Sequence, residues 1–453
     1  MPLNWKRRLL RQKGPEMELE VYLPSGSMTS LHASADAFVS DVEAMAQSHF
    51  HIGFLRLVSS KGLCLGSSLS LKEAGVQDGD ALTAIAQPLS VVSTCGAFAL
   101  WVTGGAVVTW GREEEGGNSS TVREQLRHVM QVAASDGAFA AILTNGSVVT
   151  WGAGAKGADS RQVQHQLKQV VKIYATEYAF AAILCDNSVV TWGNPACGGD
   201  KGSLDLQEVK SIAGTARAFA ALKVDGTVVT WGNEYEGGDS RGVQQQLYGV
   251  VSVQASSGAF AALRQDGSVV SWGRPQLGSD SGQAQQQLTE VVSLQSSLRA
   301  FAALKKDGRV ATWGEARDGG DSWAVQDQLQ NVELIQATGS AFCALREDGT
   351  VVCWGNRLCG GEMGVDGLGK VKQISASHTA FAAILTDGSV VTWGDPRHGG
   401  DSSAVKEQLV HVARIQATAR AFAAIRADGQ VVTWGDPNFG GDSSGVKEQL
   451  EKL

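Results

Sequence analysis

The dipeptide Trp-Gly recurs nine times in the C-terminal four fifths of the chain. Its tryptophans are Trp110, Trp151, Trp192, Trp231, Trp272, Trp313, Trp354, Trp393 and Trp434. Successive copies lie 41 residues apart, except for two intervals of 39 residues. A sequence unit of this size that is repeated many times forms a stack or a ring of small structural modules. This period therefore constrains the fold more than any other feature.

One unit, residues 374–412, shows what is repeated. Asp387-Gly388 separates the apolar run 380–385 from the β-branched run 390–394, and this pattern predicts a hairpin. We expect a type I′ turn, in which both central residues have positive φ. A further strand precedes residue 380, so each repeat has at least three strands. The helix-prone residues 405–409 are expected to replace or to precede a fourth, outer strand.

The strand that contains Phe381 is apolar on both faces, which indicates that both faces are buried. It is also rich in alanine, and small residues suit the narrow inner ends of blades that converge on an axis. The fold class that we predict is therefore mainly β, with residues 91–453 forming a β-propeller. An open or solenoid-like array with the same period is the alternative.

Composition excludes several other classes. The chain has 55 glycines and 12 tryptophans in 453 residues but only 8 prolines. Disordered low-complexity chains are enriched in proline together with glycine and avoid aromatic residues. The glycines also lack the three-residue period of collagen. We interpret the additional glycines as residues at the turns of the repeated unit.

Charge and cysteine content limit the partners that we expect. The net charge is −8, which disfavours a strong grip on nucleic acid. A basic N-terminal segment, residues 1–16, has no apolar stretch after it and is not a secretory signal. No apolar run is long enough to span a membrane. Seven dispersed cysteines without a Cys-x-x-Cys spacing fit buried thiols in a reducing compartment.

The repeats resemble those of the RCC1 (regulator of chromosome condensation) family. The resemblance rests on Leu385-x-Asp387-Gly388-x-Val390-x-x-Trp393-Gly394 and its eight relatives. The repeats of that family are usually longer and often have Gly-x-x-His before the second strand, where this chain has an Ala-Phe step. The family usually has seven blades, whereas this chain has nine repeats. A wider ring, a ring with two extra blades and an open curve are therefore all considered.

Residues 17–88 lack the repeat and predict a separate domain. Strands are expected at 17–28 and 54–58, a helix at 37–48, and a last strand at 80–86, which is the order of a β-grasp. The segment resembles the ubiquitin-like family through residues 55–58, 61–62, 69–71 and 76–82. The resemblance implies that a hydrophobic recognition patch falls on Pro24, Val58 and Ile85.

No convincing active site is found. Gly441-Asp442-Ser443-Ser444-Gly445 is similar to a serine-protease loop, but Gly-Asp-Ser recurs with the repeat and no histidine accompanies it. One aspartate per repeat cannot surround a calcium ion, and helix capping explains it better. His49 and His51 have no further ligand nearby. We therefore expect no catalytic residues, no metal and no cofactor.

The turn before each Ala-Phe step varies most between repeats. Residue types that often anchor protein interfaces stand there, namely Tyr178, Arg217, Arg299 and Arg420. Neutral drift at exposed turns explains the same variation equally simply. We retain these four residues as candidates for protein binding.

These observations predict a non-enzymatic adaptor. Its propeller would bind a protein partner, and its ubiquitin-like domain would dock to ubiquitin-pathway machinery. The resemblance to RCC1 suggests an alternative, a regulator of a small GTPase that promotes nucleotide exchange. A second alternative is an accessory of HERC-like ubiquitin ligases, since no HECT domain follows Leu453. We expect protein partners, neither nucleic acid nor membrane, and a cytoplasmic location, with the nucleus as the alternative.

Overall fold

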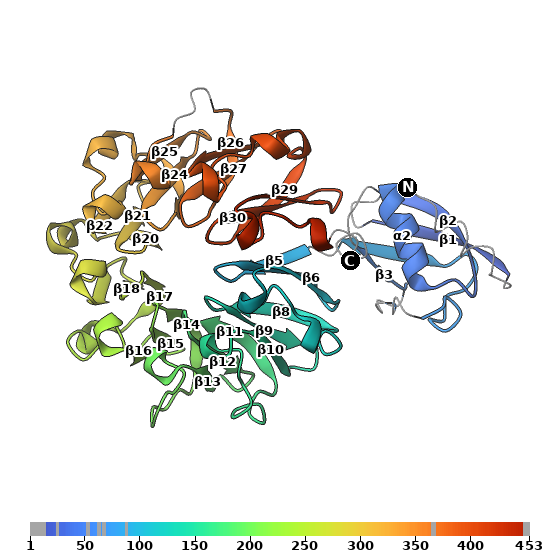
Figure 1. Cartoon of the computed structure of the whole chain (residues 1–453), viewed down its shortest axis with the longest axis horizontal. Coiled ribbons are helices and arrows are strands. Elements are labelled where there is room, and N and C mark those ends of the chain that lie inside the picture. Colours follow the sequence, from blue (N-terminus) through green and yellow to red (C-terminus); the bar gives the residue numbers. More distant parts are fainter. Residues whose placement is uncertain are drawn as a thin grey trace. The chain divides into compact units, whose positions relative to one another are not determined.

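The computed structural model describes residues 15–23, 27–50, 55–60, 65, 69–86, 89–363 and 368–446. The chain forms two compact units (Figure 1). The first comprises Met1–Leu89 with Ala427–Gln430, and the second comprises Ser90–Arg426 with Val431–Leu453.

The N-terminal unit is a four-stranded sheet with one helix. The elements are β1 (Glu16–Tyr22), β2 (Met28–Ser34), α2 (Val39–Phe50), β3 (Leu55–Val58) and β4 (Ala81–Ala86). The strand order is β2-β1-β4-β3, with β1 parallel to β4 and the other two pairs antiparallel. Alternate residues of β1, such as Leu19 and Val21, are buried with Val39 and Val42 of the helix. This is the predicted β-grasp arrangement.

The described residues of the second unit form nine three-stranded sheets, one for each Trp-Gly. We number these repeats 1 to 9 along the chain. The first strands are β5 (Leu89–Ser93), β8 (Val129–Ala134), β11 (Val170–Ala175), β14 (Val209–Gly214), β17 (Val250–Ala255), β20 (Val291–Ser296), β23 (Val332–Ala337), β26 (Val371–Ala376) and β29 (Val412–Ala417). The middle strands are β6 (Ala97–Val102), β9 (Ala138–Leu143), β12 (Ala179–Leu184), β15 (Ala218–Lys223), β18 (Ala259–Arg264), β21 (Ala300–Lys305), β24 (Ala341–Arg346), β27 (Ala380–Leu385) and β30 (Ala421–Arg426). The third strands are β7 (Val107–Gly111), β10 (Val148–Gly152), β13 (Val189–Gly193), β16 (Val228–Gly232), β19 (Val269–Gly273), β22 (Val310–Gly314), β25 (Val351–Gly355), β28 (Val390–Gly394) and β31 (Val431–Gly435).

Short 3-10 helices follow the third strands. The first of them in each repeat are η1 (Glu113–Glu115), η3 (Gly154–Lys156), η4 (Pro195–Cys197), η5 (Glu234–Glu236), η7 (Pro275–Leu277), η9 (Ala316–Asp318), η11 (Arg357–Cys359), η12 (Pro396–His398) and η14 (Pro437–Phe439). Among the described residues, six repeats add a second one: η2 (Ser120–Val122), η6 (Gln244–Gln246), η8 (Gly282–Gln287), η10 (Trp323–Gln328), η13 (Ser403–Gln408) and η15 (Ser444–Val446).

The sheets are arranged as the blades of a β-propeller. First strands of consecutive repeats contact one another and lie toward the centre, whereas third strands lie at the periphery (Figure 1). The second 3-10 helix folds back onto the outer strand, where Gln244 donates a hydrogen bond to the carbonyl of Val228 at 3.0 Å. In the repeats that have it, this helix therefore occupies the place of a fourth strand, in agreement with one of the two arrangements expected from the sequence.

Neighbouring blades pack through small residues on one side and aromatic residues on the other. Ala138 and Ala140 of repeat 2 are fully buried against Phe180 and Trp192 of repeat 3. The Phe and Trp rings of each blade are stacked, with centroids 5.1–5.4 Å apart. Alanine provides the space for these large rings, which explains why the middle strand is apolar on both faces.

Hydrogen bonds join every blade to the one before it, and they also join repeat 9 to repeat 1. Each Trp-Gly indole donates to a glycine carbonyl of the preceding repeat at 2.9–3.2 Å. Trp110 of repeat 1 donates in the same way to Gly440, 330 residues later. Ser93 also donates to the carbonyl of Ala417 at 2.7 Å. The repeats therefore form a ring of nine blades rather than a linear solenoid.

The hairpin turns differ from the type I′ geometry predicted from Asp-Gly. Among the residues around these turns only the glycine position, such as Gly226, has positive φ, and Asn187 takes its place in repeat 3. The preceding Asp225 instead accepts the amide of Thr227 at 2.9 Å. The prediction was wrong because an Asp side chain that accepts the amide two residues further on stabilises a turn in which one positive φ is sufficient.

Two cysteines also depart from the expectation of free thiols. Cys343 and Cys353 stand directly opposite each other on β24 and β25 and form a disulfide. Other repeats have alanine at the first position and threonine or serine at the second, so the 41-residue period hides the pairing. Four described cysteines are free: Cys95, Cys185, Cys197 and Cys359.

Candidate protein-binding face

A buried hydroxyl organises one end of every blade. The turn between the first and middle strands begins with Ser or Thr, whose side chain donates to the carbonyl of the last residue of the following 3-10 helix at 2.6–3.3 Å. These residues are Thr94, Ser135, Thr176, Thr215, Ser256, Ser297, Thr338, Ser377 and Thr418. The turn and the 3-10 helix are thereby held together at the same end of the sheet.

Replacing Thr215 by valine should destabilise the protein. Its Oγ1 donates to the Glu236 carbonyl at 3.1 Å and accepts the Ala218 amide at 2.9 Å, so valine leaves two buried groups unpaired. We expect the free energy of unfolding to fall by about 1–3 kcal/mol in urea titrations followed by tryptophan fluorescence. The exposed Thr289 is the control, since Thr289→Val should change it by less than about 0.5 kcal/mol. Equal losses for the two variants would contradict this role.

The next residue of each turn belongs to a closed circle of backbone hydrogen bonds. Its amide donates to the carbonyl of the equivalent residue in the following repeat at 2.8–3.4 Å. The circle runs through Cys95, Asp136, Glu177, Ala216, Ser257, Leu298, Gly339, His378 and Ala419, and the Ala419 amide donates to Cys95. This circle fixes the backbone while leaving the side chains free to differ. It is a second, independent observation that the ring closes.

We call this end of the ring the turn face. In each repeat it comprises the residue whose backbone belongs to the circle of hydrogen bonds, which we call the circle residue, and the residue after it. It also comprises four residues that begin at the N-cap of the first 3-10 helix. Its members are residues 95–96, 112–115, 136–137, 153–156, 177–178, 194–197, 216–217, 233–236, 257–258, 274–277, 298–299, 315–318, 339–340, 356–359, 378–379, 395–398, 419–420 and 436–439. The opposite end, formed by the hairpins between middle and third strands, is the hairpin face.

Charges are unevenly distributed over the turn face. Repeats 1–4 contribute seven acidic and three basic side chains: Glu113, Glu114, Glu115, Asp136, Glu177, Glu234 and Glu236, with Arg112, Lys156 and Arg217. Repeats 5–9 contribute four acidic and six basic side chains: Glu315, Asp318, Asp395 and Asp436, with Arg274, Arg299, Arg317, Arg357, Arg397 and Arg420. We refer to these two parts as the acidic half and the basic half.

In the acidic half, three basic side chains lie among seven carboxylates. Lys156 contacts Asp136 at 2.7 Å and Glu115 at 3.5 Å. Burial and the neighbouring Asp136 raise the pKa of Glu177, although Arg217 opposes this. Burial, together with Asp136 and Glu115, also raises the pKa of Cys95 to about 11. A thiol with that pKa is protonated at neutral pH and is a poor nucleophile.

The raised pKa of Glu177 makes a pH-dependent prediction. A carboxyl group whose pKa is higher in the folded state binds protons preferentially there, so its effect on stability becomes unfavourable as pH rises through that pKa. Glu177→Gln should therefore raise the melting temperature at pH 7 relative to the parent and lose this advantage near pH 4. Thermal unfolding at both pH values checks this. A variant that is less stable at pH 7 would contradict it.

In the basic half, Phe439 of repeat 9 packs under two arginines, Arg420 of the same half and Arg112 of the neighbouring repeat 1. The guanidinium groups of Arg112 and Arg420 lie over the Phe439 ring at 4.7 and 4.5 Å. Arg299 contacts Asp318 at 3.7 Å. Burial, Arg420 and His398 lower the pKa of His378, which favours its neutral form.

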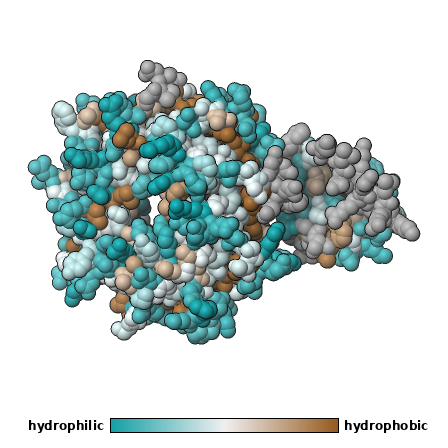
Figure 2. Space-filling view, viewed as in Figure 1, coloured by the Kyte–Doolittle hydropathy of each residue, from teal (hydrophilic) through white to brown (hydrophobic). Residues whose placement is uncertain are grey.

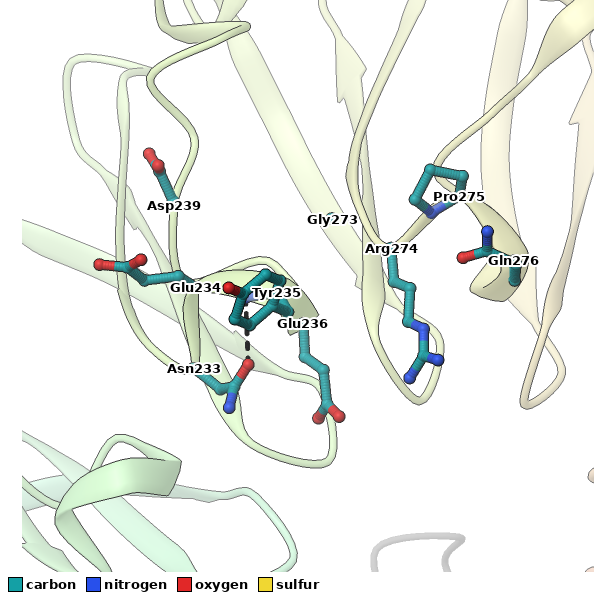
Figure 3. A pocket seen from close by; sticks show the side chains of 9 residues that line it. All are labelled: Asn233, Glu234, Tyr235, Glu236, Asp239, Gly273, Arg274, Pro275 and Gln276. Atoms are coloured by element: carbon teal, nitrogen blue, oxygen red, sulfur yellow. Dashed lines mark hydrogen bonds between the residues drawn. The ribbon is translucent and has the colours of Figure 1, made fainter.

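A shallow cleft of about 630 Å³ opens on the turn face between repeats 4 and 5. Figure 3 shows Glu234, Tyr235 and Glu236 of η5 on one wall and Arg274 and Pro275 on the other. The Tyr235 side chain is 83% exposed. A cleft with an exposed aromatic residue between opposite charges suits a protein surface better than an enclosed small molecule.

The structure places the four candidates from the turns at one equivalent position. Tyr178, Arg217, Arg299 and Arg420 each follow the circle residue, in repeats 3, 4, 6 and 9. The three arginines are exposed and Tyr178 is half-buried. Sequence reasoning missed the 3-10 helix residues such as Glu236 and Lys156, which also belong to this face. Applying the same period to the segment after each Trp-Gly would have found them.

In the N-terminal unit, two of the three predicted patch residues are described. Val58 is half-buried on β3, and Ile85 is 39% exposed on the neighbouring β4, directly opposite Arg56. Val58 and Ile85 therefore share the sheet face that does not pack on the helix. Pro24 lies outside the described residues.

Two further properties concern the described residues only. None of their helices has the length and apolar character that crossing a bilayer requires. Nowhere do three of their His, Cys, Asp or Glu side chains come together as they would around a metal ion. In Figure 2, hydrophilic residues cover much of the ring surface in view, and apolar residues are scattered among them.

Comparison with known proteins gives no family. No family model matches the chain, and no curated protein matches it. Among solved structures, Prp20p from Saccharomyces cerevisiae is 16% identical, with 68% of this chain and 82% of that chain covered and a TM-score of 0.38. Human WBSCR16 is 18% identical, with coverages of 51% and 78% and a TM-score of 0.38. Caldiarchaeum subterraneum ubiquitin is 24% identical over 16% of this chain and 96% of its own, with a TM-score of 0.16. All three TM-scores lie below 0.5, and these likenesses assign neither a family nor a function to this chain.

Proposed function

We propose that this protein is a non-enzymatic scaffold that binds a protein partner on its turn face. One observation carries the proposal. A constant framework of buried hydroxyls and a closed circle of backbone hydrogen bonds presents side chains that differ from repeat to repeat. Rigid frameworks with variable, exposed side chains at one end are typical of binding surfaces.

Tyr178, Arg217, Arg299 and Arg420 are the residues that we propose as anchors of this interface. Tyrosine and arginine combine large contact area with hydrogen bonding and are enriched among residues that dominate binding energy. The four lie at the same structural position around the ring, so one partner surface can reach several of them. No catalytic group is assigned, and a cytoplasmic location stays a prediction.

Two triple variants of the full chain test the proposal. Arg217→Glu, Arg299→Glu and Arg420→Glu together reverse three charges on the turn face. Lys306→Glu in a hairpin, with Lys168→Glu and Lys210→Glu at the starts of two first strands at the same end of the sheets, reverses three exposed charges and makes the same change in net charge. We expect affinity capture and mass spectrometry to show loss of specific partners for the first triple variant only. Equal capture by both would contradict binding at the turn face.

We further propose that the N-terminal unit docks to ubiquitin-pathway proteins through Val58 and Ile85. Support comes from the β-grasp topology and from the position of these two residues on the open sheet face. Val58→Asp should abolish capture of ubiquitin-binding proteins by the full chain. Ser30→Asp, exposed on β2 at the other edge of the sheet, is the control. Unchanged capture by Val58→Asp would remove this part of the proposal.

A small GTPase is the alternative class of partner, suggested by the sequence resemblance of the repeats to RCC1. Prp20p itself binds Gsp1p and histones. To test whether this protein promotes nucleotide exchange, the release of a fluorescent guanine nucleotide from purified GTPases is measured with and without it. Accelerated release that the turn-face triple variant lacks would support exchange activity, and flat release curves would exclude it for the GTPases tested.

A further inference from the structure

The uneven charge of the turn face is accessible to a partner. Glu113, Glu114 and Glu234 in the acidic half are exposed, as are Arg317 and Arg274 in the basic half. No ion pair is found for these five side chains within the described part of the chain. Their field is therefore not neutralised internally, and it favours a surface with the opposite distribution of charge.

A second copy of the same face has this opposite distribution when it is turned over. A two-fold axis that runs parallel to the plane of the ring, between the two turn faces and over repeat 5, reverses the order of the blades. It sets repeat 4 against repeat 6, repeat 3 against repeat 7, repeat 2 against repeat 8 and repeat 1 against repeat 9. The axis lies over repeat 5, whose turn face has a single charged residue, Arg274.

In this register the acidic half of each copy meets the basic half of the other. Glu234 and Glu236 of repeat 4 face repeat 6, where Arg317 is exposed and Arg299 contacts Asp318 of its own copy at 3.7 Å. Arg217 of repeat 4 in turn faces Glu315 and Asp318. Glu177 of repeat 3 faces repeat 7, whose turn face contributes Arg357.

Repeat 1 and repeat 9 continue the same complementarity. Glu113 and Glu114 of repeat 1 face repeat 9, where Arg420 is exposed. An interface that uses the same patch on both copies closes at two molecules and does not propagate into a fibre.

We propose that two copies of this protein associate face to face through their turn faces, with the acidic half of each on the basic half of the other. The proposal rests on the proposed function, in that the turn face is a protein-binding surface, and it names a second copy of the chain as an occupant. Because exposed charges carry the recognition, the association weakens as salt screens them.

Sedimentation velocity of the full chain tests the salt dependence. A dimer is expected at about 0.05 M salt and a monomer at about 0.5 M, where the screening length is several-fold shorter. A protein that is monomeric at every salt concentration, across the accessible range of protein concentration, would overturn the proposal. Partner capture by the turn-face triple variant is measured separately, so this failure leaves the proposed function untouched.

Charge exchange between two variants gives the sharper test. Glu113→Lys with Glu234→Lys makes the acidic half basic, and Arg317→Glu with Arg420→Glu makes the basic half acidic. Each variant alone should be monomeric at low salt because like charges then meet, whereas a mixture of the two should form a heterodimer. Lys168→Glu with Lys306→Glu, at the hairpin face, should dimerise like the parent. Failure of the mixture to associate, or dimers of each variant alone, would overturn the face-to-face arrangement. Circular dichroism confirms that the variants are folded.

Discussion

Replacing Phe260 by alanine is expected to lower the free energy of unfolding by about 3–5 kcal/mol. The ring is fully buried, is stacked on Trp272 with centroids 5.2 Å apart, and packs between the alanines of repeat 4. Its loss leaves a cavity at the junction of two blades, and the rigid strands on either side cannot move together to fill it. Urea unfolding followed by tryptophan fluorescence measures the change.

Tyr235→Ala is the matched control, because it removes an aromatic ring of similar size from the surface of the adjacent repeat. With 83% of the residue exposed, it should change stability by less than about 0.5 kcal/mol. A small effect of Phe260→Ala, comparable with that of Tyr235→Ala, would show that the contact between blades contributes little to stability.

Gly440→Ala is expected to destabilise the ring at the contact between repeat 9 and repeat 1 by about 2–5 kcal/mol. Gly440 has a φ of +91°, and a Cβ there would lie 2.5 Å from Cδ2 of Phe98. Its carbonyl also accepts the indole of Trp110 at 3.1 Å. Alanine would therefore be strained in itself and would force the two repeats apart. Differential scanning calorimetry of the full chain measures the loss.

The same change at Gly237 separates a closed ring from an open one. Gly237 occupies the equivalent place between repeats 4 and 5, with a φ of +98° and Phe260 at 2.6 Å from a Cβ. A closed ring predicts similar losses at Gly237 and Gly440, whereas an open array predicts a clearly smaller loss at Gly440, where only the backbone strain of the positive φ would remain. Gly242, around which a Cβ would meet nothing within 4 Å, is the control that should tolerate alanine.

The local structure of the blade could be predicted from sequence because each of its causes lies within one repeat. The period marks the unit, and the apolar run 380–385 predicts a strand buried on both faces, which the structure confirms. The geometry of the hairpin could not be predicted, since Asp-Gly is compatible with more than one turn and the Asp side chain decides between them. The disulfide between Cys343 and Cys353 was missed because only the register of two strands brings them together.

The closure of the ring has causes that no single repeat contains. It depends on the angle between neighbouring blades summed over nine interfaces, and the packing of Ala138 and Ala140 against Phe180 and Trp192 sets that angle. Only part of the candidate face could be predicted from the sequence, and the reason is similar. Its turn residues stand out in the sequence, but the 3-10 helix residues lie about 20 positions further on and join them only through the buried hydroxyls.

The contact between repeat 9 and repeat 1 can be measured directly by thiol cross-linking. Arg112 of repeat 1 and Arg420 of repeat 9 both lie over the Phe439 ring, at 4.7 and 4.5 Å. In a Cys185→Ser background, which removes the exposed thiol among the described free cysteines, Arg112→Cys with Arg420→Cys should be joined within one molecule by a short bis-maleimide. Arg112→Cys with Arg217→Cys, whose second thiol occupies the equivalent position in repeat 4, should not be joined. Cross-linking of the first pair alone, detected as a linked peptide in the monomer, is the result that a closed nine-bladed ring predicts. Absence of that cross-link would contradict closure.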